Sequence, residues 1–174
     1  MLFHEWSVGR SARAVAFATV ASIVSLPALA LSAAAADPGA FAPLAGVWTG
    51  SGTLSLQNGT KERMRCRAQY VVTDSGGNLQ QSLRCDSDTY HFHVNAYVND
   101  KGGSLSGSWT EETRNASGTV SGRSSGSTLS ISVSAGGAFS AHMTVATSGG
   151  GQSVDIKVKG SDITDVSVRM SKGH

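Results

Sequence analysis

From Gly46 to the end of the chain, apolar and polar residues mostly alternate, and turn-forming residues recur about every ten positions. This is the period of half-buried antiparallel strands. No stretch carries the apolar stripe and the caps of an amphipathic helix. The pattern predicts ten strands in succession, near residues 46–56, 60–73, 78–86, 89–99, 104–112, 116–123, 127–134, 138–147, 152–159 and 162–170.

The connections are rich in Gly, Asn, Asp and Ser, which supply the positive φ values that tight hairpins need. In a hairpin the inward face must continue across the turn, so each connection can be tested for register. A two-residue turn at Asn58-Gly59 would place Trp48 on the face that carries the arginines of the next strand. A three-residue loop with Gly59 in a left-handed conformation instead sets Trp48 opposite Ala68, and we expect this bulged form.

One apolar face can be followed through the later hairpins. Centring the second hairpin on Ser75-Gly76 sets Ala68 opposite Leu83. The remaining turns predict the cross-strand pairs Cys85–Tyr90, Leu83–Phe92, Val94–Trp109, Ala96–Gly107, Trp109–Val120, Val133–Phe139, Ile131–Ala141 and Met143–Ile156. A single inward face over so many turns supports the strand assignment.

Ten meandering strands leave two open edges unless the first strand pairs with the last. We therefore expect an all-β, antiparallel up-and-down meander that closes into a barrel, with a two-sheet β-sandwich as the alternative. Few large side chains are available to fill it, and several inward positions are small, namely Gly50, Ala68, Ala96, Gly107 and Ala141. The interior is then either a ligand cavity or a flattened, closely packed core.

The first segment has the pattern of an export signal. Arg10 and Arg13 precede an apolar run, and small residues precede Asp37. This is typical of a cleaved bacterial signal peptide over residues 1–36. It is followed by an N-terminal arm at 37–45 and a single barrel domain at 46–172. We expect a periplasmic or secreted protein, with no later apolar stretch long enough to span a membrane.

Cys66 and Cys85 fall directly opposite each other in the predicted second hairpin. In an oxidising compartment such a pair is predicted to form a cross-strand disulfide. A link that closes a loop of this length stabilises the fold by roughly 3 kcal/mol in the chain-entropy model.

The composition and charge of the chain exclude several classes of protein and give no support to some partners. The 174 residues are 40% hydrophobic and 15% charged, which suits one globular domain and excludes collagen-like, disulfide-dense and disordered chains. Without Arg10, Arg13 and Glu5 the chain keeps 12 basic and 11 acidic residues. This balance gives no general reason to expect nucleic acid or an anionic membrane as a partner.

The residues Gly46-Val47-Trp48 open the first predicted strand. This start resembles the Gly-x-Trp motif of the calycin group, which includes lipocalins, fatty-acid-binding proteins, nitrobindin-like haem barrels and avidins. The resemblance implies a barrel that holds a small molecule in its lumen. In lipocalins the Trp closes one barrel end and packs on an Arg near the last strand. Arg169 is the residue that could match, although its predicted register faces outward.

Several polar groups are candidates for chemistry. His91 and His93 share one face and could supply two metal ligands, although no third is evident. The other reading is that both are solvated. Glu111 has inward parity and needs either a partner such as Arg114 or a position at a barrel end near water. The arginine face, defined as Arg63, Arg65, Arg67 and Arg84, is either an anion or acidic-partner patch or a solvated outer surface. It lacks the interleaved aromatic residues that bind single-stranded nucleic acid.

The sequence assigns no catalytic residue, cofactor or metal, and we expect a non-enzymatic barrel that binds a small hydrophobic ligand. The predicted lining residues are Tyr70, Leu83, Phe92, Val94, Trp109, Phe139, Met143 and Ile156. The alternative is a module that acts through its surface, such as a barrel similar to the periplasmic metalloprotease inhibitors, with residues 37–43 as the inserting arm. An enzyme would need titratable groups inside the barrel, for which Glu111, Tyr90 and Tyr97 are the candidates.

Overall fold

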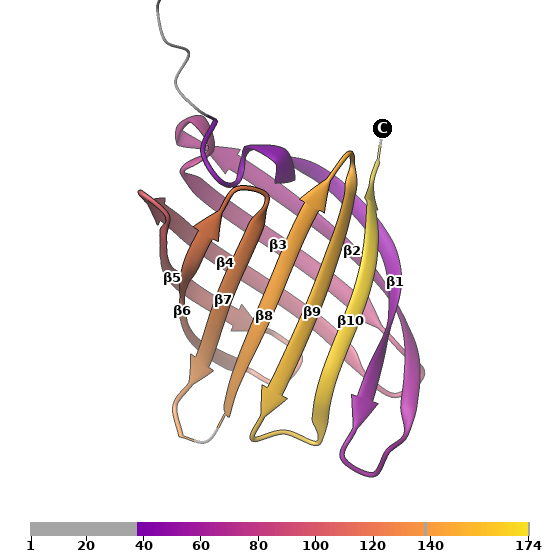
Figure 1. Cartoon of the computed structure of the whole chain (residues 1–174). Coiled ribbons are helices and arrows are strands. Elements are labelled where there is room, and N and C mark those ends of the chain that lie inside the picture. Colours follow the sequence, from indigo (N-terminus) through magenta and orange to yellow (C-terminus); the bar gives the residue numbers. More distant parts are fainter. Residues whose placement is uncertain (1–37, 138, 174) are drawn as a thin grey trace, which may run out of the picture. The chain divides into compact units, whose positions relative to one another are not determined.

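The computed structural model describes residues 38–137 and 139–173, so the predicted signal peptide lies outside the described residues. Ten antiparallel strands follow one another as a meander (Figure 1). Their bounds are β1 Gly46–Leu56, β2 Lys61–Thr73, β3 Asn78–Asp86, β4 His91–Lys101, β5 Ser104–Glu111, β6 Ala116–Ser125, β7 Thr128–Ala135, β8 Phe139–Ser148, β9 Gly151–Lys159 and β10 Ile163–Lys172. Two short 3-10 turns, η1 Ala42–Leu44 and η2 Asp74–Gly76, precede β1 and β3.

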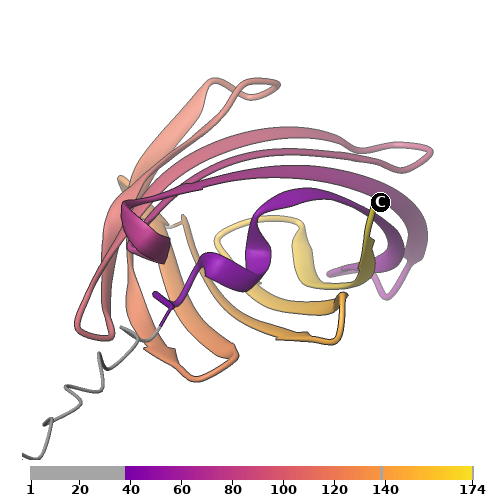
Figure 2. The same ribbon diagram turned by 90° about the horizontal axis from the view of Figure 1, so that it is seen from above.

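The sheet is a closed barrel in which β1 pairs with β10, so every strand has two neighbours. Trp48 lies opposite Lys172 and Leu54 opposite Val166 in this closing pair. This confirms the predicted up-and-down barrel and excludes the alternative, a two-sheet β-sandwich. Seen along its axis the barrel is flattened, with β2–β4 in one broad wall and β7–β10 in the other (Figure 2).

Glycines allow the strands to approach closely where the two walls meet. A Cβ atom on Gly50 of β1 would lie 2.0 Å from the Arg169 carbonyl oxygen. On Gly118 of β6 it would lie 1.7 Å from the Ser134 carbonyl oxygen. No other residue fits such contacts, which is the usual reason for a glycine inside a bent strand.

The register is confirmed at the first two hairpins and at β8–β9. Trp48 lies opposite Ala68, Cys66 opposite Cys85, and Met143 opposite Ile156. At four other hairpins the prediction is wrong by two residues. The observed pairs there are Leu83–Val94, Cys85–Phe92, Ala96–Trp109, Val98–Gly107, Trp109–Gly118, Gly107–Val120, Val133–Ala141 and Ile131–Met143.

The reason is the position and length of the turns. The β3–β4 and β5–β6 connections are four-residue loops rather than two-residue turns, because Asp86 pairs with His91 and Glu111 with Ala116. The β4–β5 turn uses Gly102 and Gly103, both with positive φ. A shift of two residues keeps every side chain on its face, so the alternation along the strands cannot detect it.

One end of the barrel, here the η1 end, is covered by the segment before β1. Phe41 and Trp48 are completely buried there, and the Trp48 indole Nε1 donates a hydrogen bond of 2.7 Å to the Leu44 carbonyl. The Gly39 and Phe41 amides donate to the carbonyls of the η2 turn. The segment is therefore part of the core rather than a detached arm (Figure 2).

The cation on Trp48 comes from the last strand, but it is not Arg169. The Lys172 ammonium lies 5.9 Å from the centre of the Trp48 ring. Arg169 is exposed on the outer surface, where it lies 3.5 Å from the Asp155 carboxylate. Trp48 therefore lies at a barrel end with a cation of the last strand over its ring, as the resemblance to lipocalins implies. Arg169 is not that cation, because alternate residues of β10 face outward and Arg169 is one of them.

The disulfide prediction is confirmed: Cys66 and Cys85 are joined, with their Cα atoms 4.1 Å apart. Both cysteines are buried in the same hydrophobic cluster as Trp48 and Trp109. Within residues 38–137 and 139–173, the structure has no helix with the length and apolar character needed to cross a membrane.

Candidate functional site

The inner side chains differ between the two ends of the barrel. At the η1 end and through the middle they are buried, as for Phe41, Trp48, Leu79, Leu105, Leu129, Val145 and Met170. At the opposite end, here the loop end, the connections 57–60, 87–90, 112–115, 136–137 and 160–162 form the rim. Inward apolar side chains next to this rim are of two kinds. Leu54, Met64, Cys85 and Ile163 are buried, whereas others remain partly exposed, namely Leu56, Leu83, Phe92, Val94, Ala116, Phe139, Met143, Ile156 and Val166.

The eight predicted lining residues all lie at inward positions of the barrel, but they divide between the ends. Leu83, Phe92, Val94, Phe139, Met143 and Ile156 lie in the half next to the loop end and are partly exposed. Tyr70 and Trp109 are buried.

The six partly exposed side chains come from facing walls. Leu83 lies directly opposite Val94 in the β3–β4 wall, and Met143 lies opposite Ile156 in the β8–β9 wall. The pairing of β3 with β4 and of β8 with β9 brings the members of each pair together. The flattening of the barrel brings the two walls toward each other (Figure 2).

Tyr70 belongs to the packing of the η1 end. Its ring contacts that of Trp48 edge to face, with the centroids 6.5 Å apart. Its hydroxyl donates a 3.2 Å hydrogen bond to the Gln152 amide oxygen. Burial raises the pKa of Tyr70 to about 12, so the phenol stays neutral. Tyr70 therefore helps to close the η1 end of the barrel and lies away from the loop end.

Two buried hydrogen-bond donors in the barrel have no acceptor among the described residues: Trp109 Nε1 and Gln152 Nε2. Trp109 lies nearer the loop end, where its ring packs on Phe139 at 5.8 Å between centroids. An unpaired buried donor costs free energy, and a bound acceptor or a water molecule would recover it. The Trp109 N–H lies beside Gly118 of β6, where an added Cβ atom would be 2.8 Å away.

An aromatic and cationic cluster lies on the rim of the loop end. Tyr90 and Phe92 stack with their ring planes 5° apart, and the Arg114 guanidinium lies 4.8 Å from the Phe92 centroid. The Tyr90 hydroxyl donates a short hydrogen bond to the Asp162 carboxylate. Sequence reasoning missed this link because the two residues lie in different loops, 72 positions apart.

Glu111 is buried just inside the same rim, where it orders the β5–β6 loop. Its carboxylate accepts hydrogen bonds from the backbone amides of His93, Thr113 and Arg114 and from the Thr113 hydroxyl, at 2.8–3.2 Å. Burial acts to raise the pKa of Glu111, but these donors outweigh it and hold the pKa below its ordinary value. A carboxylate so fully engaged is suited to holding a loop rather than to moving protons.

The two histidines of β4 are on the outer surface, and each has its own carboxylate. His91 lies 2.8 Å from Asp86, and His93 lies 2.5 Å from Glu112. These four residues border a shallow outer groove of about 240 Å³. Among the described residues no three His, Cys, Asp or Glu side chains are grouped so as to hold a metal ion.

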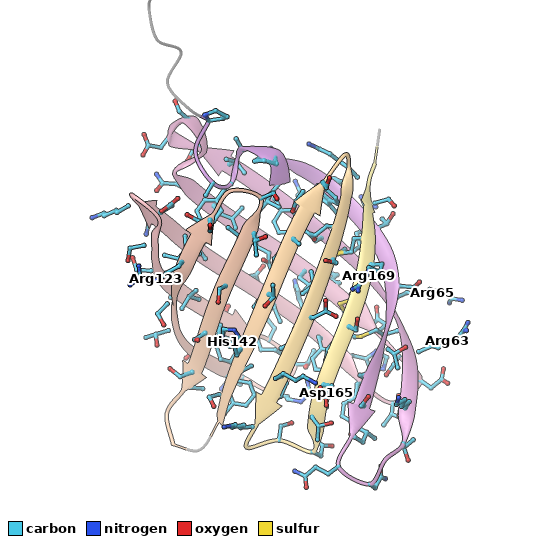
Figure 3. All side chains as sticks on the ribbon, viewed as in Figure 1. Arg63, Arg65, Arg123, His142, Asp165 and Arg169 are labelled. Carbon is cyan, nitrogen blue, oxygen red and sulfur yellow. A yellow bond between two sulfur atoms is a disulfide. The ribbon has the colours of Figure 1, made fainter. Side chains whose placement is uncertain are left out.

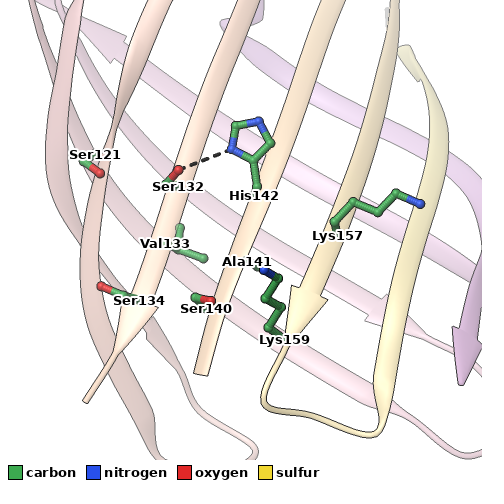
Figure 4. A pocket seen from close by; sticks show the side chains of 9 residues that line it. All are labelled: Ser121, Ser132, Val133, Ser134, Ser140, Ala141, His142, Lys157 and Lys159. Carbon is green, nitrogen blue, oxygen red and sulfur yellow. Dashed lines mark hydrogen bonds between the residues drawn. The ribbon is translucent and has the colours of Figure 1, made fainter. Parts of the chain in front are cut away.

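A second outer groove, of about 290 Å³, crosses β6–β9 (Figure 4). Its floor is mainly serine, and the Ser132 hydroxyl lies 3.3 Å from Nδ1 of His142. Among the described residues, the His142 ring is hydrogen-bonded to the hydroxyls of Ser130 and Ser132, and Lys157 is paired with Asp165 on the next strand. A serine and a histidine without a carboxylate behind them do not form the relay that activates a nucleophile.

No protein-family model and no curated protein matches this sequence. Two solved structures share its fold. Rv2717c from M. tuberculosis superposes with a TM-score of 0.60 at 10% identity, covering 76% of this chain and 94% of that chain. The S-type phycobiliprotein lyase CPES from Guillardia theta superposes with a TM-score of 0.56 at 9% identity, covering 77% and 90%. At such identities the likeness establishes a common calycin-like barrel fold.

Proposed function

We propose that this protein is a non-enzymatic, exported barrel that binds a small hydrophobic molecule at its loop end. The observation that carries the proposal is the difference between the two ends. The η1 end is packed with buried side chains, whereas at the loop end buried side chains such as Leu54 and Ile163 lie beside apolar side chains of both walls that stay partly exposed. Soluble domains bury such surface when they can, and an apolar ligand would cover it.

Leu83 and Val94 of one wall, with Met143 and Ile156 of the other, form the two sides of the proposed site. The packed rings of Trp109 and Phe139 add an aromatic contact, with Phe139 at the start of β8 beside the rim. The unpaired Trp109 indole N–H favours a ligand that carries a hydrogen-bond acceptor on an otherwise apolar body. Apolar burial supplies the affinity, at about 25 cal/mol per Å² covered, and the single donor orients the molecule.

Export is the second part of the proposal. It is supported by the charged and apolar pattern of residues 1–36 and by the Cys66–Cys85 disulfide, which persists in an oxidising compartment such as the bacterial periplasm. The surface-acting alternative, a barrel similar to the metalloprotease inhibitors, has less support. Its inserting arm would be residues 37–43, and Phe41 of that segment is completely buried in the core.

The first test is incubation of the mature protein with a total bacterial lipid extract, followed by native mass spectrometry. The proposal requires a retained small molecule, and a spectrum of unliganded protein alone contradicts it. The fluorescent probe 1-anilinonaphthalene-8-sulfonate then reports on the site.

Variants locate the binding. Leu83→Gln and Ile156→Gln change opposite walls at the loop end, and together they should weaken probe binding roughly tenfold, because each puts an amide on apolar lining. Val71→Gln is the matched control, since Val71 is 46% exposed on the outer surface. Equal weakening in the control and in the double variant would place the probe outside the barrel.

A further inference from the structure

The arginine face places four positive charges close together on the outer wall of the barrel. Arg63, Arg65 and Arg67 alternate along β2 and point outward, and Arg84 of β3 lies directly opposite Arg67. Figure 3 shows Arg63 and Arg65 projecting from β2 into solvent. None of the ion pairs between described residues includes any of the four.

The opposite wall is organised differently. There Lys157 is paired with Asp165, and Arg169 with Asp155. Without its leader the chain has 12 basic and 11 acidic residues, so the arginine face is a local excess on a nearly neutral protein. Like charges directly opposed across strands oppose folding, so Arg67 and Arg84 give the fold no stability through their charges.

The acidic groups near the arginines are already engaged. Asp86 lies opposite Arg65 in register, but its carboxylate contacts His91. Glu112 contacts His93, the cross-strand neighbour of Arg84. Glu62 accepts hydrogen bonds from Ser87 and Thr89 of the β3–β4 loop. The guanidinium groups are thus left to solvent or to a partner.

The same outer wall also exposes apolar surface. Val71 of β2 and Tyr97 of β4 are 46% and 57% exposed, and they are the large exposed hydrophobic residues of the described chain. Both lie opposite Gln80 of β3, so they occupy one row across the three strands. The arginines and the Tyr–Val row therefore lie on the same outer wall, which is formed by β2–β4.

We propose that this wall, formed by β2–β4, docks the protein on a membrane surface that contains anionic phospholipids. Basic side chains are drawn to the negative potential of such a surface, and the attraction adds over residues that reach it together. Tyrosine is enriched at membrane interfaces because its ring is apolar and its hydroxyl is polar. The proposal does not depend on a ligand at the loop end, since it uses only the outer wall.

A flat lipid surface fits this wall better than an acidic peptide. Arg63, Arg65 and Arg67 lie outside both surface grooves, and only Arg84 borders one. A peptide that binds by adding a strand needs a free strand edge, and the barrel is closed. Charges spread over a broad wall suit a partner whose own charge is spread over a plane.

The test is cosedimentation of the mature protein with vesicles of phosphatidylcholine alone and of phosphatidylcholine with phosphatidylglycerol. Binding is expected only to the anionic vesicles, and it should fall as salt is added. Replacing Arg63, Arg65, Arg67 and Arg84 together by Gln should weaken it at least tenfold. The matched control replaces Arg123, Lys157, Lys159 and Arg169 by Gln, which changes the net charge equally on other strands and should retain binding.

Tyr97→Ala should weaken vesicle binding further in the presence of salt, because it removes the apolar contact and leaves the charge unchanged. The proposal is overturned if the wild-type protein does not sediment with anionic vesicles, or if both quadruple variants lose binding equally. It is also overturned if polyglutamate binds as tightly as the vesicles and displaces them, which would assign the arginine face to an acidic protein. Circular dichroism confirms that each variant is folded.

Discussion

Tyr90 and Asp162 are linked by a hydrogen bond that spans the loop end of the barrel. Tyr90 directly precedes β4, and Asp162 directly precedes β10. Around the ring these two strands are separated by β3, β2 and β1, so the contact joins one wall to the other. The Asp162 carbonyl also accepts a 2.8 Å hydrogen bond from the Gln57 amide, which ties a third loop to the same place.

This link should slow the exchange of a ligand bound at the loop end. Tyr90→Phe removes the hydroxyl and keeps the ring stacked on Phe92. We expect the dissociation rate of a bound probe to rise several-fold, with little change in unfolding free energy, as measured by stopped-flow fluorescence. Tyr97→Phe removes a hydroxyl from the outer wall and serves as the control. An unchanged dissociation rate in Tyr90→Phe would show that the link does not control access.

Acid should break the same link. The hydrogen bond from Tyr90 lowers the pKa of Asp162 below its ordinary value of 3.8. The carboxylate is therefore ionised and accepting at neutral pH. The stabilising effect of this hydrogen bond is complete above pH 3.8, the pKa of Asp162 in the unfolded chain. It is lost as the pH falls through the lower pKa of Asp162 in the folded protein. Probe dissociation should accelerate below that pH in the wild type and not in Asp162→Asn, whose rate should already be raised at neutral pH.

Glu111 should contribute to stability in a pH-dependent way. Its folded pKa lies below the ordinary value of 4.5, so the contribution is present above about pH 4.5 and is lost as pH falls through the folded pKa. Glu111→Gln should lower the unfolding free energy by about 1–3 kcal/mol at neutral pH, because the charged acceptor of several hydrogen bonds is lost. In urea titrations the difference should shrink toward pH 3, and a constant difference would exclude ionisation as its cause.

Removal of the disulfide should cost about 3 kcal/mol of unfolding free energy, from the entropy of the loop between Cys66 and Cys85. The double variant Cys66→Ala, Cys85→Ala and the reduced wild type should unfold at similar urea concentrations. The loop-entropy account requires the disulfide to restrict the unfolded chain. Equal unfolding free energies for the reduced and the oxidised protein would contradict it.

Gly118→Ala should be strongly destabilising. The new Cβ would lie 1.7 Å from the Ser134 carbonyl oxygen and 2.8 Å from Trp109 Nε1, so β6 must move away from β7. We expect a loss of about 3 kcal/mol or more in chemical unfolding. Gly136→Ala is the control, because a Cβ there meets no atom within 4 Å, and its effect should stay within about 0.5 kcal/mol.

The alternation of residues predicted all ten strands and the inward face, because burial acts on every second residue. It could not fix the register at hairpins such as β3–β4, since both Leu83–Phe92 and the observed Leu83–Val94 keep the same face inward. Only the geometry of the loop 87–90 decides between them. There the Ser87 amide donates to the Tyr90 carbonyl at 2.8 Å, which produces a four-residue connection.

For the site, the sequence predicted which side chains face inward but not how they divide between the two ends. That division depends on Phe41 and Leu44, which lie before the first strand and fill one end of the barrel. It also depends on loop contacts such as Tyr90–Asp162. These form only because the barrel closes, and no pattern of neighbouring residues in the sequence indicates them. The sequence pattern showed the arginine face. Only the structure shows that its four arginines form no ion pairs with described residues, because Asp86 and Glu112 contact histidines instead.

The pairing of Trp48 with Lys172 joins residues from the two extremes of the described fold. During synthesis, β1 gains its second neighbour only when β10 has emerged. Until then its free amides and carbonyls can template the strands of another molecule, which is how amyloid begins. A stop codon or a proteolytic cut that removes β10 is thus expected to leave an aggregation-prone chain, and chaperones are needed most in that interval.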